Sequence, residues 1–456
     1  MVVLERGWLI ILLSAGCVAD VDVLSKGDDP VDALSASAAG TRDSTGFGDT
    51  FFASGSNDTT NPFFASLGTN GRACVNCHQQ AQGWTITPAG AQAVFNATGG
   101  NDPLFRLNDG SVSPTADVST LAARQSAYAM LLTKGLIRVG IGIPASAEFT
   151  LDAVDDPYHY ASAAELSLFR RPLPTTNMPF LATVMWDGRE TLSATDMNSN
   201  FAHQAMDATL GHAQASSTDP AQMNRIVTFE TALFTTQTID NRSGALDVAG
   251  ALGGPKNLAN QPFSIGVNDP LKPGFNKSAM TLFNAWAPPT QPLTDTVSRS
   301  RYSIFRGQQI FNTRPIAITG VTGLNDFLGV TTLMGTCTTC HNTPNVGNHS
   351  TSLPINIGIA DASRRTADMP LYTLRNKVTG ATVQTTDPGR ALITGKWVDI
   401  GKFKGPILRG LQLRAPYFHN GSAATLQDVV AFYNGRFAMG LTSQDQADLV
   451  AFLQAL

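Results

Sequence analysis

The sequence predicts a mostly α-helical protein built as two domains with loop-rich insertions. Three observations lead to this prediction. One cysteine–histidine motif occurs twice, starting at residues 74 and 337. Helix-capping signals stand near the C-terminus, and no segment is rich in strand-forming residues. The chain has 456 residues, of which 43% are apolar, so it can bury two hydrophobic cores.

The low charge of the chain narrows the class of its partners. Only 14% of the residues are charged, the net charge is −4, and no cluster of Lys and Arg stands out. A protein that binds DNA or RNA needs a basic surface to neutralise phosphates. The sequence therefore predicts no nucleic-acid partner.

The N-terminus, residues 1–17, has the order of an export signal. In MVVLERGWLIILLSAGC a basic residue precedes an apolar run too short to cross a bilayer, and small residues lead to Cys17. Its end resembles the lipobox of bacterial lipoproteins, although Ser14 stands where that motif prefers Leu. We expect export to the bacterial periplasm or cell envelope with lipidation of Cys17; ordinary cleavage, with Cys17 incidental, stays open. Residues 18–40, rich in Asp, Ser and Ala, would follow as a flexible tether.

Four of the five cysteines form two matching patterns, CVNCH and CTTCH. In each, two cysteines separated by two residues are followed at once by a histidine. This is the pattern of covalent haem c, in which the two thiols add to the haem vinyl groups and the imidazole binds the iron. The sequence therefore predicts two haem c groups, with His78 and His341 as iron ligands and thioether links at Cys74, Cys77, Cys337 and Cys340.

Two other uses of these cysteines are weighed against haem. A disulfide across two intervening residues would be a redox device and would leave the histidines unexplained. A zinc site built from all four thiols would also leave both histidines unused, and its ligands would be far apart in the sequence. Haem accounts for every cysteine and histidine of both motifs.

Each motif is expected to lie in its own cytochrome c-like haem domain, with the two domains packed around an interface. Residues 41–290 would form the N-terminal domain and residues 296–456 the C-terminal one, separated at the Pro- and Thr-rich break APPTQPLTD. The clearest helices follow the second motif. Thr425 and Thr442 each stand three residues before an Asp, which is the pattern of a helix N-cap.

The sequence resembles the bacterial di-haem cytochrome c peroxidase and MauG family. The resemblance rests on MWDGRETL at 185–192, on TTNMP at 175–179, and on some forty residues beginning DPGRALITGK at 387–426. It covers the C-terminal domain well and the N-terminal domain in patches. The stretches of about 100–165 and 235–300 look like insertions, and the family resemblance implies nothing about them.

The resemblance implies different roles for the two haems. Peroxide would react at the haem of His78, the haem of His341 would relay electrons, and Trp186 would lie between them. A calcium ion between the domains is also implied, because this chain has the residues of the family's calcium site and calcium prefers oxygen ligands. These residues are Asn177 and, through their backbone carbonyls, Arg414 and Pro416.

The peroxide pocket departs from the family pattern. Family members carry a Gln, and ten residues later a Glu, beyond the WDGR tract. Here Gln204 fits the glutamine but no Glu follows at that distance, and His212 is the expected substitute because an imidazole can take and return a proton. His203 is the fallback, and Glu230 is expected to be structural. The family's histidine that ligates the first iron before reduction is also missing; only His159 stands nearby.

The distal ligand of the second haem is expected to be Tyr433. The resemblance places this residue where peroxidases have Met and MauG-like members have Tyr. A neutral thioether favours ferrous iron, whereas a phenolate favours ferric and higher states. Met439 stays open as an alternative. A helix would hold the phenol of Tyr433 at a fixed angle, whereas Met439 stands in a loop that would have to fold back.

Together these features predict an exported di-haem peroxidase, which reduces hydrogen peroxide at the N-terminal haem with electrons relayed through the C-terminal haem. Gln204, His212 and Trp186 would serve the reaction. The reductant would be a small periplasmic cytochrome c or cupredoxin, and analogy with relatives suggests a homodimer. Three alternatives stay open: peroxide-dependent oxidation of a partner protein, as in MauG-like members; a non-enzymatic electron carrier; and an oxygen-using di-haem oxygenase.

Overall fold

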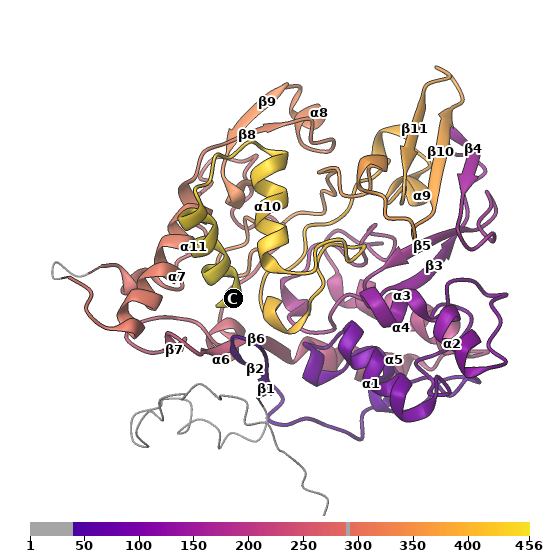
Figure 1. Cartoon of the computed structure of the whole chain (residues 1–456), viewed down its shortest axis with the longest axis horizontal. Helices are drawn as coiled ribbons and strands as arrows, with labels where there is room; N and C mark the ends of the chain where they lie inside the picture. Colours follow the sequence, from indigo (N-terminus) through magenta and orange to yellow (C-terminus); the bar gives the residue numbers. More distant parts are fainter. Residues whose placement is uncertain (1–39, 289–291) are drawn as a thin grey trace, which may run out of the picture.

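The computed structural model describes residues 40–288 and 292–456 (Figure 1). The predicted export signal, Cys17 and the tether up to residue 39 lie outside these described residues, and so do residues 289–291 of the predicted break. Helix content is 32% and strand content 16%. The expected mostly α-helical fold is therefore confirmed only in part, because four small antiparallel sheets stand among the helices of the described residues.

The first sheet packs against the region of the first cysteine motif. Its strands run in the order β1 (Thr41–Arg42), β2 (Gly46–Phe52), β6 (Leu233–Asp240) and β7 (Gly244–Ala245). Thr50 of β2 is buried and accepts a hydrogen bond of 2.9 Å from the indole of Trp84. The sequence of β6, LFTTQTID, lacks the alternation of apolar and polar residues from which a strand is predicted.

A second sheet joins segments that are far apart in the sequence. Strand β4 (Phe149–Asp155) pairs with β10 (Leu371–Asn376), which pairs in turn with β11 (Thr382–Thr385). Figure 1 shows β4 in magenta beside β10 in orange. Because β4 belongs to the predicted insertion at 100–165, this insertion is bonded to the C-terminal part of the chain. The two remaining pairs are β3 (Ile137–Ile141) with β5 (Leu166–Arg170), and β8 (Ile316–Thr319) with β9 (Thr332–Gly335).

Helices α1 and α3 supply buried side chains beside Cys77, and helices α4 and α5 supply them beside Cys74. Polar caps begin these helices where the sequence offers them. Thr87 accepts a hydrogen bond at the start of α1, and Asp196 accepts one at the start of α4. The helices of this half are α1 (Pro88–Thr98), α2 (Leu121–Ala127), α3 (Ala129–Lys134), α4 (Met197–Gly211), α5 (Pro220–Thr231) and α6 (Pro255–Ala259).

The two helices predicted after the second motif are confirmed. Thr425 and Asp428 cap α10, and Thr442 and Asp445 cap α11, each pair exchanging side-chain and backbone hydrogen bonds. Helix α11 packs along α7, the longest helix of the described residues. The helices of this half are α7 (Thr296–Thr313), α8 (Asn325–Leu328), α9 (Ala391–Thr394), α10 (Leu426–Arg436) and α11 (Ser443–Gln454).

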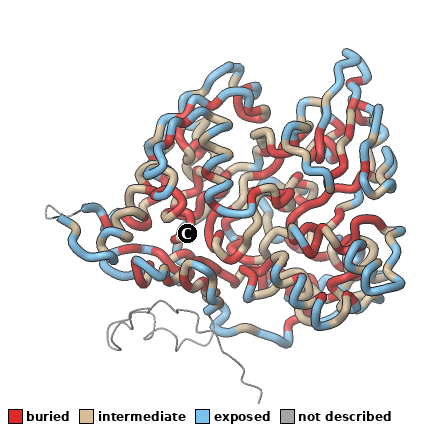
Figure 2. The backbone as a smooth tube through the Cα atoms, in the orientation of Figure 1, coloured by how far each residue is buried: buried red, intermediate tan, exposed pale blue. Residues whose placement is uncertain are grey.

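The largest apolar core lies around the second motif, and buried segments run through the interior of the molecule (Figure 2). This core gathers side chains from α7, α10 and α11. It also includes Leu246, Met280 and Trp286, which precede the boundary predicted near residue 290. The two-domain division stays a prediction, because the stretch before the boundary packs with the C-terminal core. Among the described residues, no helix is long and apolar enough to cross a membrane.

Candidate functional site

Both cysteine motifs fold into the same tight turn. Cys74–Asn76 and Cys337–Thr339 are single 3-10 turns, and in each the N–H of the following histidine donates to the carbonyl of the first cysteine at 3.0 Å. The third residue closes the turn with its side chain: Asn76 accepts a backbone N–H at 2.7 Å and Thr339 accepts one at 3.0 Å. The turn thus brings two thiols and one imidazole together, as attachment to one porphyrin requires.

The two histidines are oriented in the same way. His78 Nδ1 lies 3.1 Å from the carbonyl oxygen of Trp84, and His341 Nδ1 lies 2.7 Å from that of Gly347. In both cases the acceptor stands six residues after the histidine. Donation from Nδ1 fixes the tautomer and leaves the lone pair of Nε2 for a metal. The loops return to the histidine through positive φ angles, +62° at Gly83 and +79° at Gly347, which glycine adopts without strain.

Burial keeps these groups uncharged. It lowers the pKa of His78 to about 4 and also lowers that of His341, so both imidazoles are in the neutral form that binds metals. Burial also raises the pKa of the thiols, to about 11 for Cys77 and to about 12 for Cys337 and Cys340. The sites therefore present neutral thiols and neutral imidazoles.

Neither alternative use of the cysteines is realised in the described residues. All four cysteines of the motifs are free thiols, so no disulfide closes either pair. The four thiols are also not gathered into a metal site, because the one group of three or more His, Cys, Asp or Glu side chains that could share an ion there contains no cysteine. Haem attachment at these cysteines stays a prediction.

The second motif opens into a large, mostly apolar cavity. Its volume is about 230 Å³, and Cys337, Cys340 and His341 line it. Phe311 stands with its ring centre 6.0 Å from that of His341. Aliphatic side chains from the β8 strand, the 355–359 segment and α10 complete the wall: Ile316, Ile318, Ile355, Ile357, Ile359, Leu426, Val429 and Val430. A flat apolar ring with two thioether anchors fits such a wall.

Three buried or half-buried cations also line this cavity. Arg171, Lys404 and Arg414 donate only to backbone carbonyls, and none of them forms an ion pair with a carboxylate within the described part of the chain. Burial lowers the pKa of Lys404 to about 7 and that of Arg171 to about 9. Buried cations without a counter-ion are costly, so the cavity suits a ligand with carboxylates. Haem, with its two propionates, meets this requirement.

Trp186 forms part of the wall of the same cavity. Its indole N–H donates to the carbonyl of Arg171 at 2.8 Å, and its own carbonyl accepts the backbone N–H of Lys404 at 2.9 Å. Thr85, the residue after Trp84, lines the cavity too and donates through its hydroxyl to the carbonyl of Pro172 at 2.7 Å. Segments next to the first motif therefore reach the cavity of the second.

Tyr433 and Met439, the two expected distal ligands, both line the cavity. Burial raises the pKa of the Tyr433 phenol, and the nearby thiols of Cys340 and Cys337 raise it further. Met439 is buried, and its carbonyl accepts hydrogen bonds from Arg314. The loop of Met439 is already folded back against the cavity and held there by Arg314, so its position does not count against Met439 as the ligand.

The first motif stands among aromatic rings. Phe63 has its ring centre 6.5 Å from His78, 6.0 Å from Trp84 and 5.1 Å from Phe229, and both Phe63 and Trp84 are fully buried. On the other side, Cys77 packs against a cluster that includes side chains of α1 and of the predicted insertion at 100–165. The insertion is thus part of the surroundings of this site.

His212, the expected acid–base residue, is oriented by a carboxylate from the same insertion. Its Nδ1 is hydrogen-bonded to Asp109, which also forms a buried ion pair with Arg72, two residues before Cys74. Although burial opposes it, Arg72 and His212 together lower the pKa of Asp109. The charge of His212 contributes to the low pKa of His78, which places it near the first motif. Gln204 is half-buried on α4.

Glu230 of α5, expected to be structural, is a buried carboxyl near the first motif. Its side chain is 4% exposed and its Oε2 has no hydrogen-bond partner in the described part of the structure. Burial raises its pKa to about 8, so the carboxyl carries a proton at neutral pH. Glu230 stands near Cys74. Burial is the main cause of the raised pKa of the Cys74 thiol, and the charge of Glu230 raises that pKa further. In the sequence, the one feature that could have pointed to Glu230 is that it is a single acidic residue in the apolar stretch IVTFETALF.

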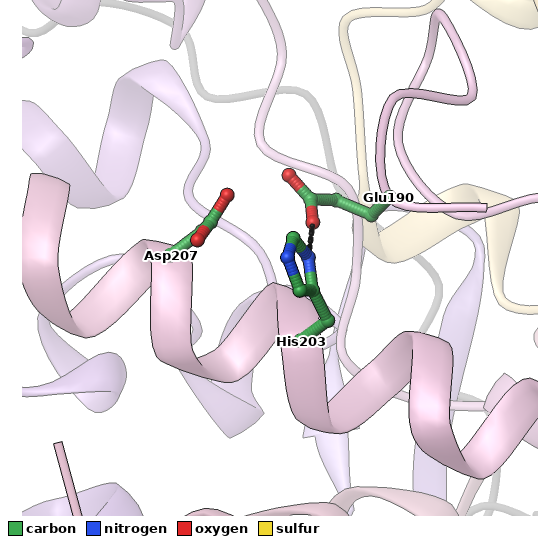
Figure 3. Close-up of side chains that lie close together, drawn as sticks. All are labelled: Glu190, His203 and Asp207. Carbon is green, nitrogen blue, oxygen red and sulfur yellow. Dashed lines mark hydrogen bonds and ion pairs between the residues drawn. The ribbon is translucent and has the colours of Figure 1, made fainter. Parts of the chain in front are cut away.

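His203, the fallback base, has a different partner. Its Nδ1 lies 2.6 Å from Oε2 of Glu190, and Asp207 stands one turn further along α4 (Figure 3). His159 is exposed and has a positive φ of 54°, and its ring makes no hydrogen bond among the described residues.

Two of the residues expected to bind calcium already use their oxygen atoms in hydrogen bonds with other protein groups. The side-chain amide of Asn177 exchanges hydrogen bonds of 2.8 and 2.9 Å with the backbone of Thr235. The carbonyl of Arg414 accepts a hydrogen bond from the guanidinium of Arg171 at 3.1 Å. A calcium ion would have to share these oxygens, one of them with a cation, and its binding stays a prediction.

Comparisons with known proteins give several partial matches. No protein-family model matches the chain. It is 35% identical over 133 residues to the cytochrome c peroxidase IdrP2 of Denitromonas iodatirespirans, covering 27% of this chain and 36% of that protein. It is 51% identical over 69 residues to the cytochrome c peroxidase IdrP1 of the same organism, covering 13% and 18%. To the cytochrome c551 peroxidase of Pseudomonas aeruginosa it is 31% identical over 121 residues, covering 26% and 30%.

The chain therefore spans little more than a third of the curated relatives it matches, at most 36% in these three alignments. Among solved structures, a MauG-like protein associated with microbial copper homeostasis aligns with a TM-score of 0.39 and 16% identity, over 87% of this chain and 86% of that one.

Proposed function

Because the chain is a relative of the di-haem cytochrome c peroxidases, as the sequence resemblance predicted, we propose that it is an exported peroxidase with two haem c groups. Hydrogen peroxide would be reduced at the haem of His78, with electrons relayed through the haem of His341. The observation that carries the proposal is the pair of matching turns, each with free thiols and an imidazole oriented by the carbonyl six residues on. Haem would supply the iron that binds peroxide and the iron that stores electrons.

Peroxide is assigned to the first site because of the groups around it. Reduction of peroxide to two waters consumes two electrons and two protons, so proton carriers are needed near the oxidant. Near the first motif stand His212, held by Asp109, and the protonated carboxyl of Glu230. The cavity of the second motif is instead lined by two side chains that could occupy the distal coordination position of an iron, Tyr433 and Met439.

His212 is the proposed proton carrier of the peroxide pocket. Its Nδ1 faces the carboxylate of Asp109, which leaves Nε2 to exchange protons with a bound oxidant. Asp109 stabilises the imidazolium that forms when the proton is taken up. Gln204 would donate a hydrogen bond to peroxide, as the resemblance implies, and Glu230 would serve as a second reservoir of protons.

Electrons would cross between the sites through Trp186. A chain of hydrogen bonds supports this route: His78 to the carbonyl of Trp84, Thr85 to Pro172, and the carbonyl of the adjacent Arg171 to the indole of Trp186. Trp186 lies in the wall of the cavity that His341 lines. The chain of contacts therefore begins at one proposed iron ligand and ends beside the other site.

The donor of electrons is proposed to be a small periplasmic cytochrome c or cupredoxin, with the enzyme acting as a homodimer and with one calcium ion between its halves.

A second function is favoured by the position of Tyr433. If this phenol closes the second iron, the oxidising equivalent could be passed to a partner protein, as in MauG-like proteins, instead of being quenched by a small donor.

Mixing the resting ferric protein with one equivalent of hydrogen peroxide tests the proposed function. We expect the Soret band to shift within milliseconds to seconds, and the original spectrum to return when a reduced small cytochrome c is added. A Soret band that stays unchanged would identify an electron carrier. Consumption of dioxygen without added peroxide would identify the oxygenase alternative.

A further inference from the structure

Away from the haem motifs, the side chains of Glu190, His203 and Asp207 converge beside helix α4 (Figure 3). One ligand atom from each lies within 4.8 Å of the other two. Within residues 40–288 and 292–456, this is the one group of three or more His, Cys, Asp or Glu side chains close enough to share an ion. None of the proposed steps of peroxide reduction uses it.

The cluster is built on fixed backbone. His203 and Asp207 are four residues apart on α4, so their side chains are neighbours on one face of the helix. Phe201, Ala205 and Thr209 are buried and anchor the opposite face. Glu190 follows the WDGR tract, in which Asp187 is fully buried and pairs with Arg170 at 2.5 Å. Both parts of the cluster are therefore held before any ligand arrives.

The cluster has more acceptors than donors. Glu190 is 5% exposed at its side chain, yet its only hydrogen bond among the described residues is the one of 2.6 Å from His203 to Oε2. Its Oε1 has only the guanidinium of Arg189 nearby, at 3.7 Å. Asp207 is exposed, and Figure 3 shows no hydrogen bond between its carboxylate and either of the other two residues. Two carboxylates and one imidazole thus share a single hydrogen bond, and in the described part of the chain Oε1 of the buried Glu190 has only the ion pair with Arg189.

We propose that Glu190, His203 and Asp207 bind one divalent transition-metal ion of the Zn²⁺ class. One imidazole nitrogen with two carboxylate oxygens is a ligand set that suits Zn²⁺ and its neighbours, whereas calcium prefers oxygen ligands alone. Three protein ligands leave at least one position for water. The ion would join the turn that carries Trp186 to the helix that carries Gln204, so it would fix the two relative to each other.

Isothermal titration of the haem-loaded, chelator-treated full chain with ZnCl₂ tests this inference. We expect one Zn²⁺ to bind per chain at pH 7.5. His203→Ala and Asp207→Asn should each weaken binding by about 30-fold or more, since each removes one of three ligands. His159→Ala, which removes an exposed imidazole outside the cluster, should bind as the wild type does.

Two results would overturn the inference. Wild-type protein that takes up no Zn²⁺ would show that the cluster is an ion pair alone. Equal binding by wild type and His203→Ala would place the ion elsewhere. Unchanged haem spectra and far-ultraviolet circular dichroism of the variants would show that they are folded, and neither measurement depends on whether the protein reacts with peroxide.

Discussion

The two histidines that are expected to bind iron differ in their surroundings and not in their own geometry. His78 and His341 each donate from Nδ1 to a carbonyl six residues later. His212 and Glu230 lie near the first motif, whereas the second motif faces a cavity lined by two potential iron ligands. The different roles proposed for the two haems therefore depend on the residues around each histidine and not on the histidine itself.

Substitution of the distal residues tests which of them closes the second iron. Tyr433→Phe should remove the native low-spin signal of that haem from the electron paramagnetic resonance spectrum, because it deletes the phenol oxygen and leaves the ring in place. Met439→Leu should keep the signal, since it preserves the packing of this buried position. The reverse pattern would assign the ligand to Met439.

Glu230 should make stability depend on pH. The unfolded side chain loses its proton near pH 4.5, whereas burial raises the folded pKa to about 8. Between these values the folded protein keeps a proton that the unfolded chain has released, so the free energy of unfolding falls as pH rises, by up to about 1.4 kcal/mol per pH unit. Glu230→Gln should remove this slope.

Urea unfolding of the haem-loaded protein at pH 5, 6, 7 and 8 measures this effect. The variant should gain stability over the wild type progressively from pH 5 to pH 8. Curves that stay parallel across this range would show that Glu230 does not keep its proton in the folded state.

The two cysteine–histidine motifs, which predict haem attachment, are visible in the sequence, whereas the residues that the fold brings close to them are not. Thioether attachment demands one spacing, so both haem motifs are visible in the chain. No fixed spacing or motif in the sequence points to Asp109, Lys404 or Glu230. Each acquires its role from burial or from a partner distant in sequence, such as the ion pair between Asp109 and Arg72.

At the scale of elements, local signals predicted the capped helices but not the strands. Thr425 and Thr442 cap α10 and α11 because side chain and backbone lie within one turn. Strand β6 is rich in Thr and Gln, and β4 finds its partner more than two hundred residues away in β10. Such strands are stabilised by partners that no local pattern reveals.

The insertion at 100–165 is the element that delivers Asp109 to His212. Asp109→Asn should slow the reaction with peroxide by about 100-fold, because the imidazole loses the carboxylate that orients it and stabilises its charged form. Stopped-flow mixing over a range of pH measures the rate and its pH profile.

Asp117→Asn is the matched control, because Asp117 is exposed and lies in the same insertion. It should leave the rate and its pH profile unchanged. Equal rates for wild type and Asp109→Asn would remove His212 from the proposed role, provided that the haem content of the variant is normal.

At the scale of the whole molecule, the two halves of the chain are interlocked. The sheet of β4, β10 and β11 contains strands from both, and Leu246, Met280 and Trp286 enter the core around the second motif. The sequence break near residue 290 predicts a simple boundary, because composition does not report where the preceding apolar residues pack.

Trp186 is expected to carry those electrons. Trp186→Phe keeps an aromatic ring in the wall but removes the hydrogen bond to Arg171. Electron transfer between the haems should slow by about tenfold, equivalent to roughly 1.4 kcal/mol in the barrier. Stopped-flow spectra of the reduced protein mixed with peroxide resolve the oxidation of the second haem, and an unchanged rate would exclude this route.

The electron paramagnetic resonance spectrum of the resting ferric protein shows whether the first iron keeps an open coordination position. We expect one high-spin and one low-spin haem in equal amounts, with cyanide converting only the high-spin signal to low spin. Two low-spin signals that cyanide leaves unchanged would mean that protein ligands close both irons, and would contradict the assignment of the first haem to peroxide.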